Sequence, residues 1–243
     1  MYYRAFNICA LSGELDIYQP LRYLISVVKL CKRCDNGVRM ANTKVITYAF
    51  TKPVKTKRLI IRAFTMEDLT AFFSIMNDEE VNVFLPWYTV KNMSEAKELL
   101  ERRYIPGNNR ESASRLAVCL KSDNNPIGYV SVSSSGSYDF GYALKKDFWN
   151  QGYATEAAQA AAFMLKNNGY PFITATHDVN NPASGAVMKK VGMKYCYSYV
   201  EQWQPKDISV TFRMYQLNFD GNEGRVYMGY WDKYPLHFIE PDV

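Results

Sequence analysis

The sequence predicts a mixed α/β fold, in which a mostly antiparallel central sheet contains one parallel pair of strands and is flanked by helices. Three β-like runs follow one another closely between residues 115 and 144, as in an antiparallel meander. A long alanine-rich helical segment comes next, at 152–168. A strand, a helix and another strand follow it, and a strand–helix–strand unit implies a parallel crossover.

The first half of the domain begins with a strand rich in branched residues. Thr65 and Asp68 then have the spacing of a capping box and open a helix. The turn Ser122-Asp123-Asn124-Asn125-Pro126 separates two later strands. The expected elements are a strand at 57–64, helices at 65–77 and 94–103, and strands at 115–120, 127–132 and 138–144.

The second half alternates helices with strands. Gly169 ends the long helix as a C-cap, and Asn181-Pro182 opens the next helix with an N-cap and a proline in its first turn. The expected elements are a helix at 152–168, a strand at 172–177, a helix from 181, and strands at 195–201 and 208–217.

Composition excludes several classes of protein. The chain has 243 residues, 48% of them hydrophobic and 22% charged, which fits a globular protein and excludes a disordered or fibrous one. Residues 1–40 carry six basic and three acidic groups of a chain whose net charge is +5. A nucleic-acid-binding protein would instead cluster positive charge on its folded face, so we expect no nucleic-acid partner.

Cysteine usage and the early hydropathy pattern predict a cytoplasmic protein. The five cysteines follow no disulfide spacing, which favours a reducing compartment. The apolar run at 23–30 is interrupted and too short to span a bilayer, so no membrane partner is expected. Cys31 and Cys34 have the spacing of half a zinc site, but no second pair accompanies them, so we expect no metal.

Three regions are expected along the chain. Residues 1–44 form a poorly defined N-terminal extension, either a loose appendage upstream of a fresh start at Met40 or a docking helix at 18–32. Residues 45–220 form the main domain. Residues 221–243 form an aromatic tail that packs on the domain and whose surface suits a homodimer interface.

The most informative segment is Phe148-Trp149-Asn150-Gln151-Gly152-Tyr153-Ala154-Thr155-Glu156-Ala157. It lies between a strand and a helix, and its small residues let a ligand approach the backbone. The exposed N–H groups and the helix dipole favour an anion there, and a pyrophosphate is a natural occupant. The pattern is neither GxxxxGK[ST] nor GxGxxG, so it supports neither a nucleoside-triphosphate site nor a Rossmann site. An ordinary tight turn into a helix remains the alternative.

A second segment, His177 to Met193, lies one strand later and at the same end of the predicted sheet. Together with the first segment and with Thr56-Lys57-Arg58-Leu59-Ile60-Ile61-Arg62, it closely resembles the GNAT N-acetyltransferase superfamily. The most similar branch is that of the ribosomal-protein alanine N-acetyltransferases. The resemblance runs from about Thr56 to Leu217, with its motifs in order.

This resemblance implies a GNAT fold in which acetyl-CoA, as co-substrate, lies between the splayed fourth and fifth strands. The pantetheine arm would pair with the backbone of one strand end, and the pyrophosphate would rest on the amides of the loop before the long helix. Trp149 departs from the family pattern, and Asn150 stands where many relatives have glycine. The implied cofactor-binding residues are Ala143, Leu144, Lys145, Asn150, Gln151, Gly152, Tyr153, Ala154, Thr155, Asn181 and Ser184.

The resemblance also implies the catalytic roles. Asn181 would hydrogen-bond the pantetheine arm, and Ser184 would protonate the departing CoA thiolate. Glu201 and Asp139 compete as the general base, with Glu201 favoured; either one could instead be a solvated charge at a strand end. His177 is expected to be structural, and Trp87 to line the acceptor side or to pack.

The expected function is transfer of an acetyl group from acetyl-CoA to a primary amine by direct attack in a ternary complex. The amine acceptor would be a peptide N-terminus or a small molecule. The alternative is a non-catalytic acyl-CoA-binding or regulatory protein that keeps the same scaffold without a working base.

Overall fold

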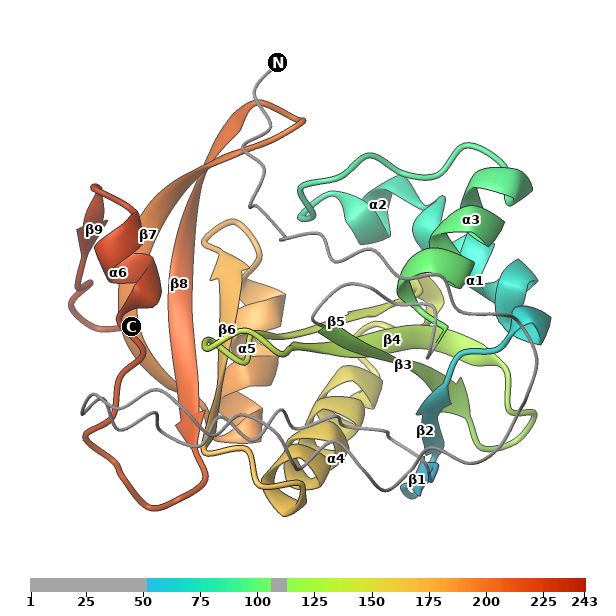
Figure 1. The fold of residues 1–243 in the computed structure, drawn as a ribbon, viewed down its shortest axis with the longest axis horizontal. Coiled ribbons are helices and arrows are strands. Elements are labelled where there is room, and N and C mark those ends of the chain that lie inside the picture. The colour runs from blue at the N-terminus through green and yellow to red at the C-terminus, as the bar shows by residue number, and fades with distance from the viewer. Residues whose placement is uncertain (1–51, 106–112) are drawn as a thin grey trace, which may run out of the picture. The chain divides into compact units, whose positions relative to one another are not determined.

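The computed structural model describes residues 52–105 and 113–243 (Figure 1). The chain divides into a unit at Met1–Val45 and a unit at Ile46–Val243, and every element below belongs to the second. The helix expected at 18–32 and the Cys31–Cys34 pair lie outside the described residues.

The strands form two sheets that run in different directions (Figure 1). The first sheet is antiparallel and follows chain order: β1 (Val54–Lys55), β2 (Leu59–Ala63), β3 (Ala113–Leu120), β4 (Pro126–Ser133) and β5 (Phe140–Leu144). The second sheet has the order β6 (Phe172–Asp178), β8 (Ile208–Asn218), β7 (Lys194–Trp203) and β9 (His237–Phe238).

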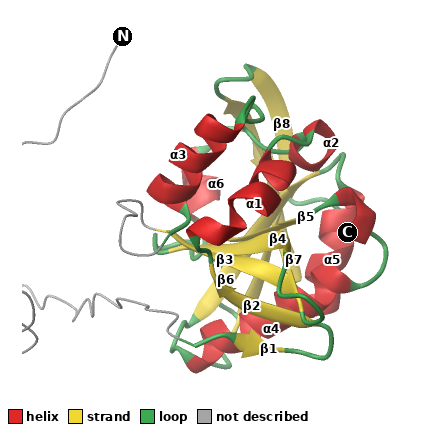
Figure 2. Ribbon diagram, turned by 90° about the vertical axis from the view of Figure 1, so that its right-hand side faces the viewer, coloured by secondary structure: helices red, strands yellow, loops and turns green. Residues whose placement is uncertain are grey.

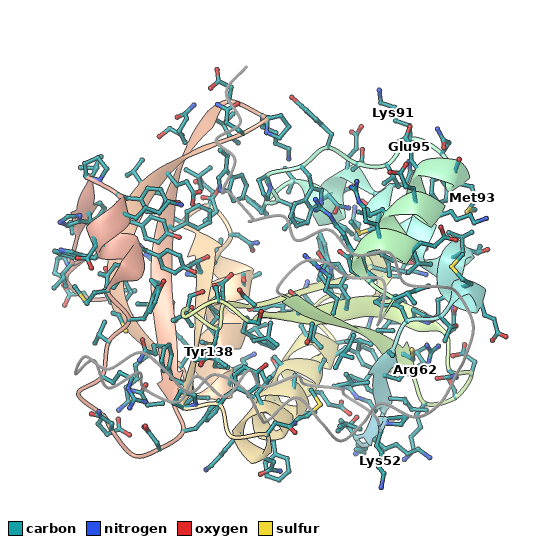
Figure 3. The ribbon with its side chains drawn as sticks, viewed as in Figure 1. Lys52, Arg62, Lys91, Met93, Glu95 and Tyr138 are labelled. Carbon is teal, nitrogen blue, oxygen red and sulfur yellow. The ribbon has the colours of Figure 1, made fainter. Side chains whose placement is uncertain are left out.

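A single parallel bridge between Asp139 and Thr174 joins β5 to β6. Tyr138, labelled in Figure 3, lies beside this junction with its ring 5.1 Å from Tyr170 and 5.3 Å from Phe172, measured between centroids. The sequence predicts a parallel crossover between the strands on either side of the helix from 181, which are β6 and β7. These two strands are not hydrogen-bonded neighbours in the sheet. β8 lies between β6 and β7 and is antiparallel to both, because the last long strand inserts between them.

Helices cover both faces of the first sheet (Figure 2). α1 and α3 lie on one face, and α4 lies on the other. No helix in the described part of the chain is long and apolar enough to cross a membrane. The helical elements are η1 (Met66–Asp68), α1 (Leu69–Met76), α2 (Glu79–Asn82), α3 (Met93–Arg103), η2 (Lys146–Phe148), α4 (Tyr153–Asn167), α5 (Pro182–Val191) and α6 (Gly229–Lys233).

Two of the predicted helix starts, at Thr65 and Asn181, are confirmed by their caps. The Thr65 backbone N–H donates to Asp68 Oδ2 at 2.8 Å, and Arg62, labelled in Figure 3, donates to the same carboxylate at 2.8 Å. Asn181 Oδ1 accepts the Ser184 backbone N–H at 3.2 Å. These side chains satisfy N–H groups that a helix start leaves without partners, which fixes where each helix begins.

The core has a small-residue side and an aromatic side. The buried face of α4 consists largely of alanines, so the helix packs closely on the first sheet. On the other face, the rings of Phe64, Phe72 and Tyr104 meet edge to face at 4.7–5.6 Å between centroids. This packing fixes β5 and the start of α4, which border the cavities described below.

The C-terminal segment, defined here as residues 227–240, packs against β7. Residues of β9 pair with Ser198 and Tyr199, and the Glu240 carboxylate accepts hydrogen bonds from Arg213 and Ser198. Its helix, α6, places an indole ring edge to face on Tyr197, with 5.4 Å between centroids. Neither α6 nor β9 is predicted by the sequence pattern.

Candidate active site

Two cavities meet at the point where the two sheets separate. The α4 cavity, of about 580 Å³, is lined by the end of β5, the loop before α4 and the first turns of α5. The β7 cavity, of about 490 Å³, is lined by the other part of β5, the ends of β6 and β7, and the C-terminal segment. Both are lined by Val81, Phe84, Tyr142, Ala143, Asn181 and Ser184.

The loop before α4 has a left-handed backbone at two positions. Asn150 has φ 57° and Gly152 has φ 78°. Asparagine tolerates this conformation better than most residues, so Asn150 can adopt it. The first-turn N–H groups of α4 have no partner within the helix and carry the positive end of its dipole, so this edge of the α4 cavity can bind an anion.

An ion pair ties this loop to the start of the domain. Arg58 Nε donates to Glu156 Oε2 at 2.6 Å, and Arg58 Nη1 donates to the Gln151 carbonyl at 2.9 Å. Thr56 Oγ1 donates to Glu156 Oε1 at 2.6 Å. These contacts hold the pKa of Glu156 below its usual value, despite the opposing effect of burial. The motif at 56–62 therefore positions the loop from outside the cavity.

Most of the predicted cofactor residues line one cavity. Ala143, Leu144, Asn150, Gly152, Ala154, Thr155, Asn181 and Ser184 line the α4 cavity.

Lys145, Gln151 and Tyr153 are not among the residues that line it. The Lys145 backbone N–H donates to the Ile127 carbonyl at 2.8 Å, within the strand pairing. The Arg58 guanidinium lies 4.0 Å from the centroid of the Tyr153 ring, so this side chain packs on the ion pair. Trp149 does line the cavity, and its indole N–H donates to the Leu144 carbonyl at 2.8 Å.

Tyr142 is a site residue that sequence reasoning missed. Its hydroxyl donates to the Ser184 carbonyl at 2.7 Å and lies 3.1 Å from Ser184 Oγ. Burial raises the pKa of Tyr142 to about 12, so the hydroxyl stays protonated at neutral pH. Period-two alternation along the predicted strand gives a weak signal for such a residue, because it places Tyr142 on the same face as the strand-end Leu144.

Asp139 and Glu201 both line the β7 cavity. Burial, with a smaller contribution from the negative charge of Glu201, raises the pKa of Asp139 to about 7, although the Tyr230 and Thr174 hydroxyls act in the opposite direction. Thr174 Oγ1 lies 3.5 Å from Asp139 Oδ1. A carboxyl group that titrates near neutral pH is suited to accept a proton during catalysis.

Two further side chains border the β7 cavity with unsatisfied polar atoms. His177 Nδ1 lies 2.8 Å from the Asp178 carbonyl, while its Nε2 is buried beside Gly185 with no hydrogen-bond partner of normal geometry among the described residues. Burial lowers the pKa of His177, which keeps the ring neutral. The indole Nε1 of Trp87 is also buried, and no residue within 52–105 or 113–243 hydrogen-bonds to it.

We next consider whether the described residues could hold a metal ion. Within residues 52–105 and 113–243, no group of three or more His, Cys, Asp or Glu side chains is arranged to hold a metal ion. The arrangement instead offers an anion-binding loop, a carboxyl group that titrates near pH 7 and a hydroxyl pair at the junction of two cavities.

The family model described as "Acetyltransferase (GNAT) domain" matches residues 58–194, which contain the loop, Tyr142 and Ser184. The chain belongs to the GNAT acetyltransferase family. It is therefore an acetyl-CoA-dependent acyltransferase with the GNAT fold.

The chain is similar to a curated N-acetyltransferase and to solved structures that are named for different acceptors. The chain is 30% identical over 145 residues to the uncharacterized N-acetyltransferase YnaD of Bacillus subtilis, covering 58% of this chain and 82% of that protein. It resembles a Vibrio cholerae spermidine N-acetyltransferase crystallised with CoA and spermine, with TM-score 0.58 and 16% identity over 67% of this chain and 96% of the other. It also resembles RimL, a ribosomal L7/L12 α-N-protein acetyltransferase in complex with coenzyme A, with TM-score 0.57 and 19% identity. That comparison covers 70% of this chain and 100% of the RimL chain.

Proposed function

We propose that this GNAT enzyme transfers the acetyl group of acetyl-CoA to a primary amine, with acetyl-CoA in the α4 cavity and the amine in the β7 cavity. The observation that carries this proposal is the junction of the two cavities at Tyr142 and Ser184. An amine in the β7 cavity could reach a thioester at that junction. The rest of the CoA molecule would extend from the thioester through the α4 cavity to the anion-binding loop.

The loop before α4 would bind the pyrophosphate of acetyl-CoA. Its support is the left-handed backbone at Asn150 and Gly152, together with the N-terminal end of α4. Ala143 and Leu144 lie at the end of β5 and line the same cavity, so the pantetheine arm would follow that strand. Asn181 caps α5 and also lines the cavity, and one side chain can serve both purposes.

Asp139 would act as the general base. Attack on the thioester needs a neutral amine, whereas a primary amine is protonated at neutral pH, so a carboxylate must take its proton. We favour Asp139 over Glu201 because its pKa lies near 7, where a base is both ionised and sufficiently basic. The negative charge of Glu201 would contribute by raising that pKa.

Ser184 would return a proton to the leaving CoA sulfur. When the new C–N bond forms and the C–S bond breaks, the electron pair of the C–S bond remains on sulfur as a thiolate. Ser184 Oγ is 3.1 Å from the Tyr142 hydroxyl, so Tyr142 can hold the serine in place. A proton relayed from solvent through the Tyr142 hydroxyl would restore the serine and leave Tyr142 neutral. Proximity within the joined cavities would supply much of the remaining acceleration.

Two measurements on the purified protein test this function. Calorimetric titration with acetyl-CoA should show micromolar binding, and release of free CoA thiol should then depend on an added amine. A folded sample that does not bind acetyl-CoA would contradict the cofactor assignment. Binding without any amine-dependent thiol release would instead support a non-catalytic acyl-CoA-binding protein.

Tyr142→Phe tests the hydroxyl pair. We expect kcat to fall by about tenfold, since the thiolate loses a positioned proton source, while the Kd for acetyl-CoA stays within about twofold. Steady-state kinetics and calorimetry measure the two effects separately. Tyr88→Phe is the matched control, because Tyr88 is exposed and does not line either cavity. An unchanged kcat in Tyr142→Phe would remove Tyr142 from the proton path.

A further inference from the structure

The C-terminal segment supplies one wall of the β7 cavity. Tyr230, Lys233 and Tyr234 line this cavity together with Asp139 and Glu201. The match to the family model ends at residue 194, so the wall lies outside the span that this chain shares with that model.

The segment is anchored at its far end by Glu240. Arg213 Nε and Nη2 donate to the two oxygens of that carboxylate at 3.0 and 2.5 Å. The backbone N–H of Glu240 also donates to the Tyr195 hydroxyl at 2.9 Å. Paired charges with two-point geometry hold a chain segment more firmly than a single surface contact does. The wall is therefore a fixed part of the cavity.

Stacked rings make this wall aromatic. The buried ring of Tyr199 lies parallel to Tyr234, with 4.8 Å between centroids and an interplanar angle of 8°. It lies nearly parallel to Tyr230, at 5.2 Å and 20°. Trp87 and Trp203 also line the cavity. Aromatic surfaces of this kind favour flat rings and organic cations.

The charges in the cavity nearly balance. Lys233 Nζ lies 4.6 Å from the centroid of the Tyr234 ring and donates to its hydroxyl at 2.7 Å, so a cation already occupies this part of the wall. A ligand with several ammonium groups would bring more positive charge than the carboxylates can neutralise, whereas one ammonium group matches the site. The acidic, basic and histidine residues that line the cavity are Asp139, Asp178, Glu201, Arg115, Lys233 and the neutral His177.

The size of the cavity fits a small molecule. Its volume of about 490 Å³ lies within the range of pockets for compact organic ligands, about 300–1,000 Å³. The buried Trp87 Nε1, which has no hydrogen-bond partner in the part of the chain that the structure describes, is a donor that a ligand atom could satisfy.

From these observations we infer that the acceptor is a compact monoamine carrying an aromatic ring. The ring packs against Tyr230, Trp87 and Trp203, beside the stack that Tyr199 and Tyr234 form. The ammonium group reaches Asp139 and Glu201. This inference rests on the proposed acetyl transfer to amines.

The test compares acceptors that differ in one property. With the full chain and saturating acetyl-CoA, we expect kcat/KM for 2-phenylethylamine to exceed that for 2-cyclohexylethylamine by about tenfold, because the two share the same reach but only one has a π-system. Spermidine and a hexapeptide with a free N-terminal alanine should each be poorer acceptors than 2-phenylethylamine.

Tyr234→Leu links this preference to the C-terminal segment. We expect it to reduce the phenyl-to-cyclohexyl ratio to within about twofold of one. Phe238→Leu makes a similar change in the same segment without touching the cavity lining and should keep the wild-type ratio. Should Tyr234→Leu fail to fold, the wild-type ratios alone decide.

The possible outcomes distinguish failure of the aromatic-monoamine inference from failure of the proposed acetyl transfer. Preference for spermidine or the peptide, or equal use of the phenyl and cyclohexyl amines, would overturn the aromatic-monoamine inference and leave acetyl transfer intact. Binding of acetyl-CoA with no turnover of any amine would overturn the proposed function, and the inference would fall with it.

Discussion

Gly152→Glu is expected to lower the affinity for acetyl-CoA by at least about 100-fold. Gly152 has φ 78°, a conformation that costs a residue with a Cβ about 1–2 kcal/mol. The new carboxylate would also stand at the N-terminus of α4, where the pyrophosphate is proposed to bind, and would repel it. Calorimetric titration measures the loss directly.

Gly221→Glu is the matched control for this substitution. Gly221 also has φ 78°, and a Cβ added there meets no atom within 4 Å. It imposes the same backbone strain and the same charge change outside both cavities. Wild-type affinity is expected. If Gly152→Glu bound acetyl-CoA as tightly as Gly221→Glu does, the phosphates would have to lie elsewhere.

Asp139→Asn is expected to lower kcat/KM by about 100-fold at pH 8 without changing acetyl-CoA affinity. In the wild type the activity should rise with pH through about 7, because only the ionised form of Asp139 accepts the proton and its pKa is about 7. Below that pH the protonated form dominates and activity falls. Asp139→Asn should lose this acidic limb. A pH series of kcat/KM for both proteins shows it.

Asp123→Asn provides the control for this loss. Asp123 is exposed and caps a turn through Oδ1, an oxygen that asparagine retains. The variant should keep both the rate and the acidic limb. If Asp139→Asn kept the limb and Glu201→Gln lost it instead, Glu201 would be the base.

The sequence predicts the elements whose cause is local. Thr65, Asp68 and Asn181 mark helix starts because each cap acts within three residues. Gly152 is predictable as part of an anion-binding loop because the backbone conformation and the helix start both depend on neighbouring residues.

Other features depend on contacts between distant segments, which no local pattern contains. The insertion of β8 between β6 and β7 is set by pairing across many residues, so sequence order suggests a different neighbour. Tyr142 gains its role only when α5 brings Ser184 within 3.1 Å. The backbone carbonyl of Gln151 accepts a hydrogen bond from Arg58, and these residues are 93 positions apart in the sequence. The α6 helix is too short for periodicity to reveal it.

The β7 cavity draws on one stretch of the chain that the α4 cavity does not use. The pocket that holds the anion-binding loop is built from residues 80–190, whereas Glu201, Tyr230 and Tyr234 in the other pocket come after residue 194. The wall that the C-terminal segment supplies is therefore the part of the proposed acceptor site that can vary without altering the anion-binding loop. An exchange of this segment is expected to change which amine is accepted while the loop proposed to hold the pyrophosphate stays as it is.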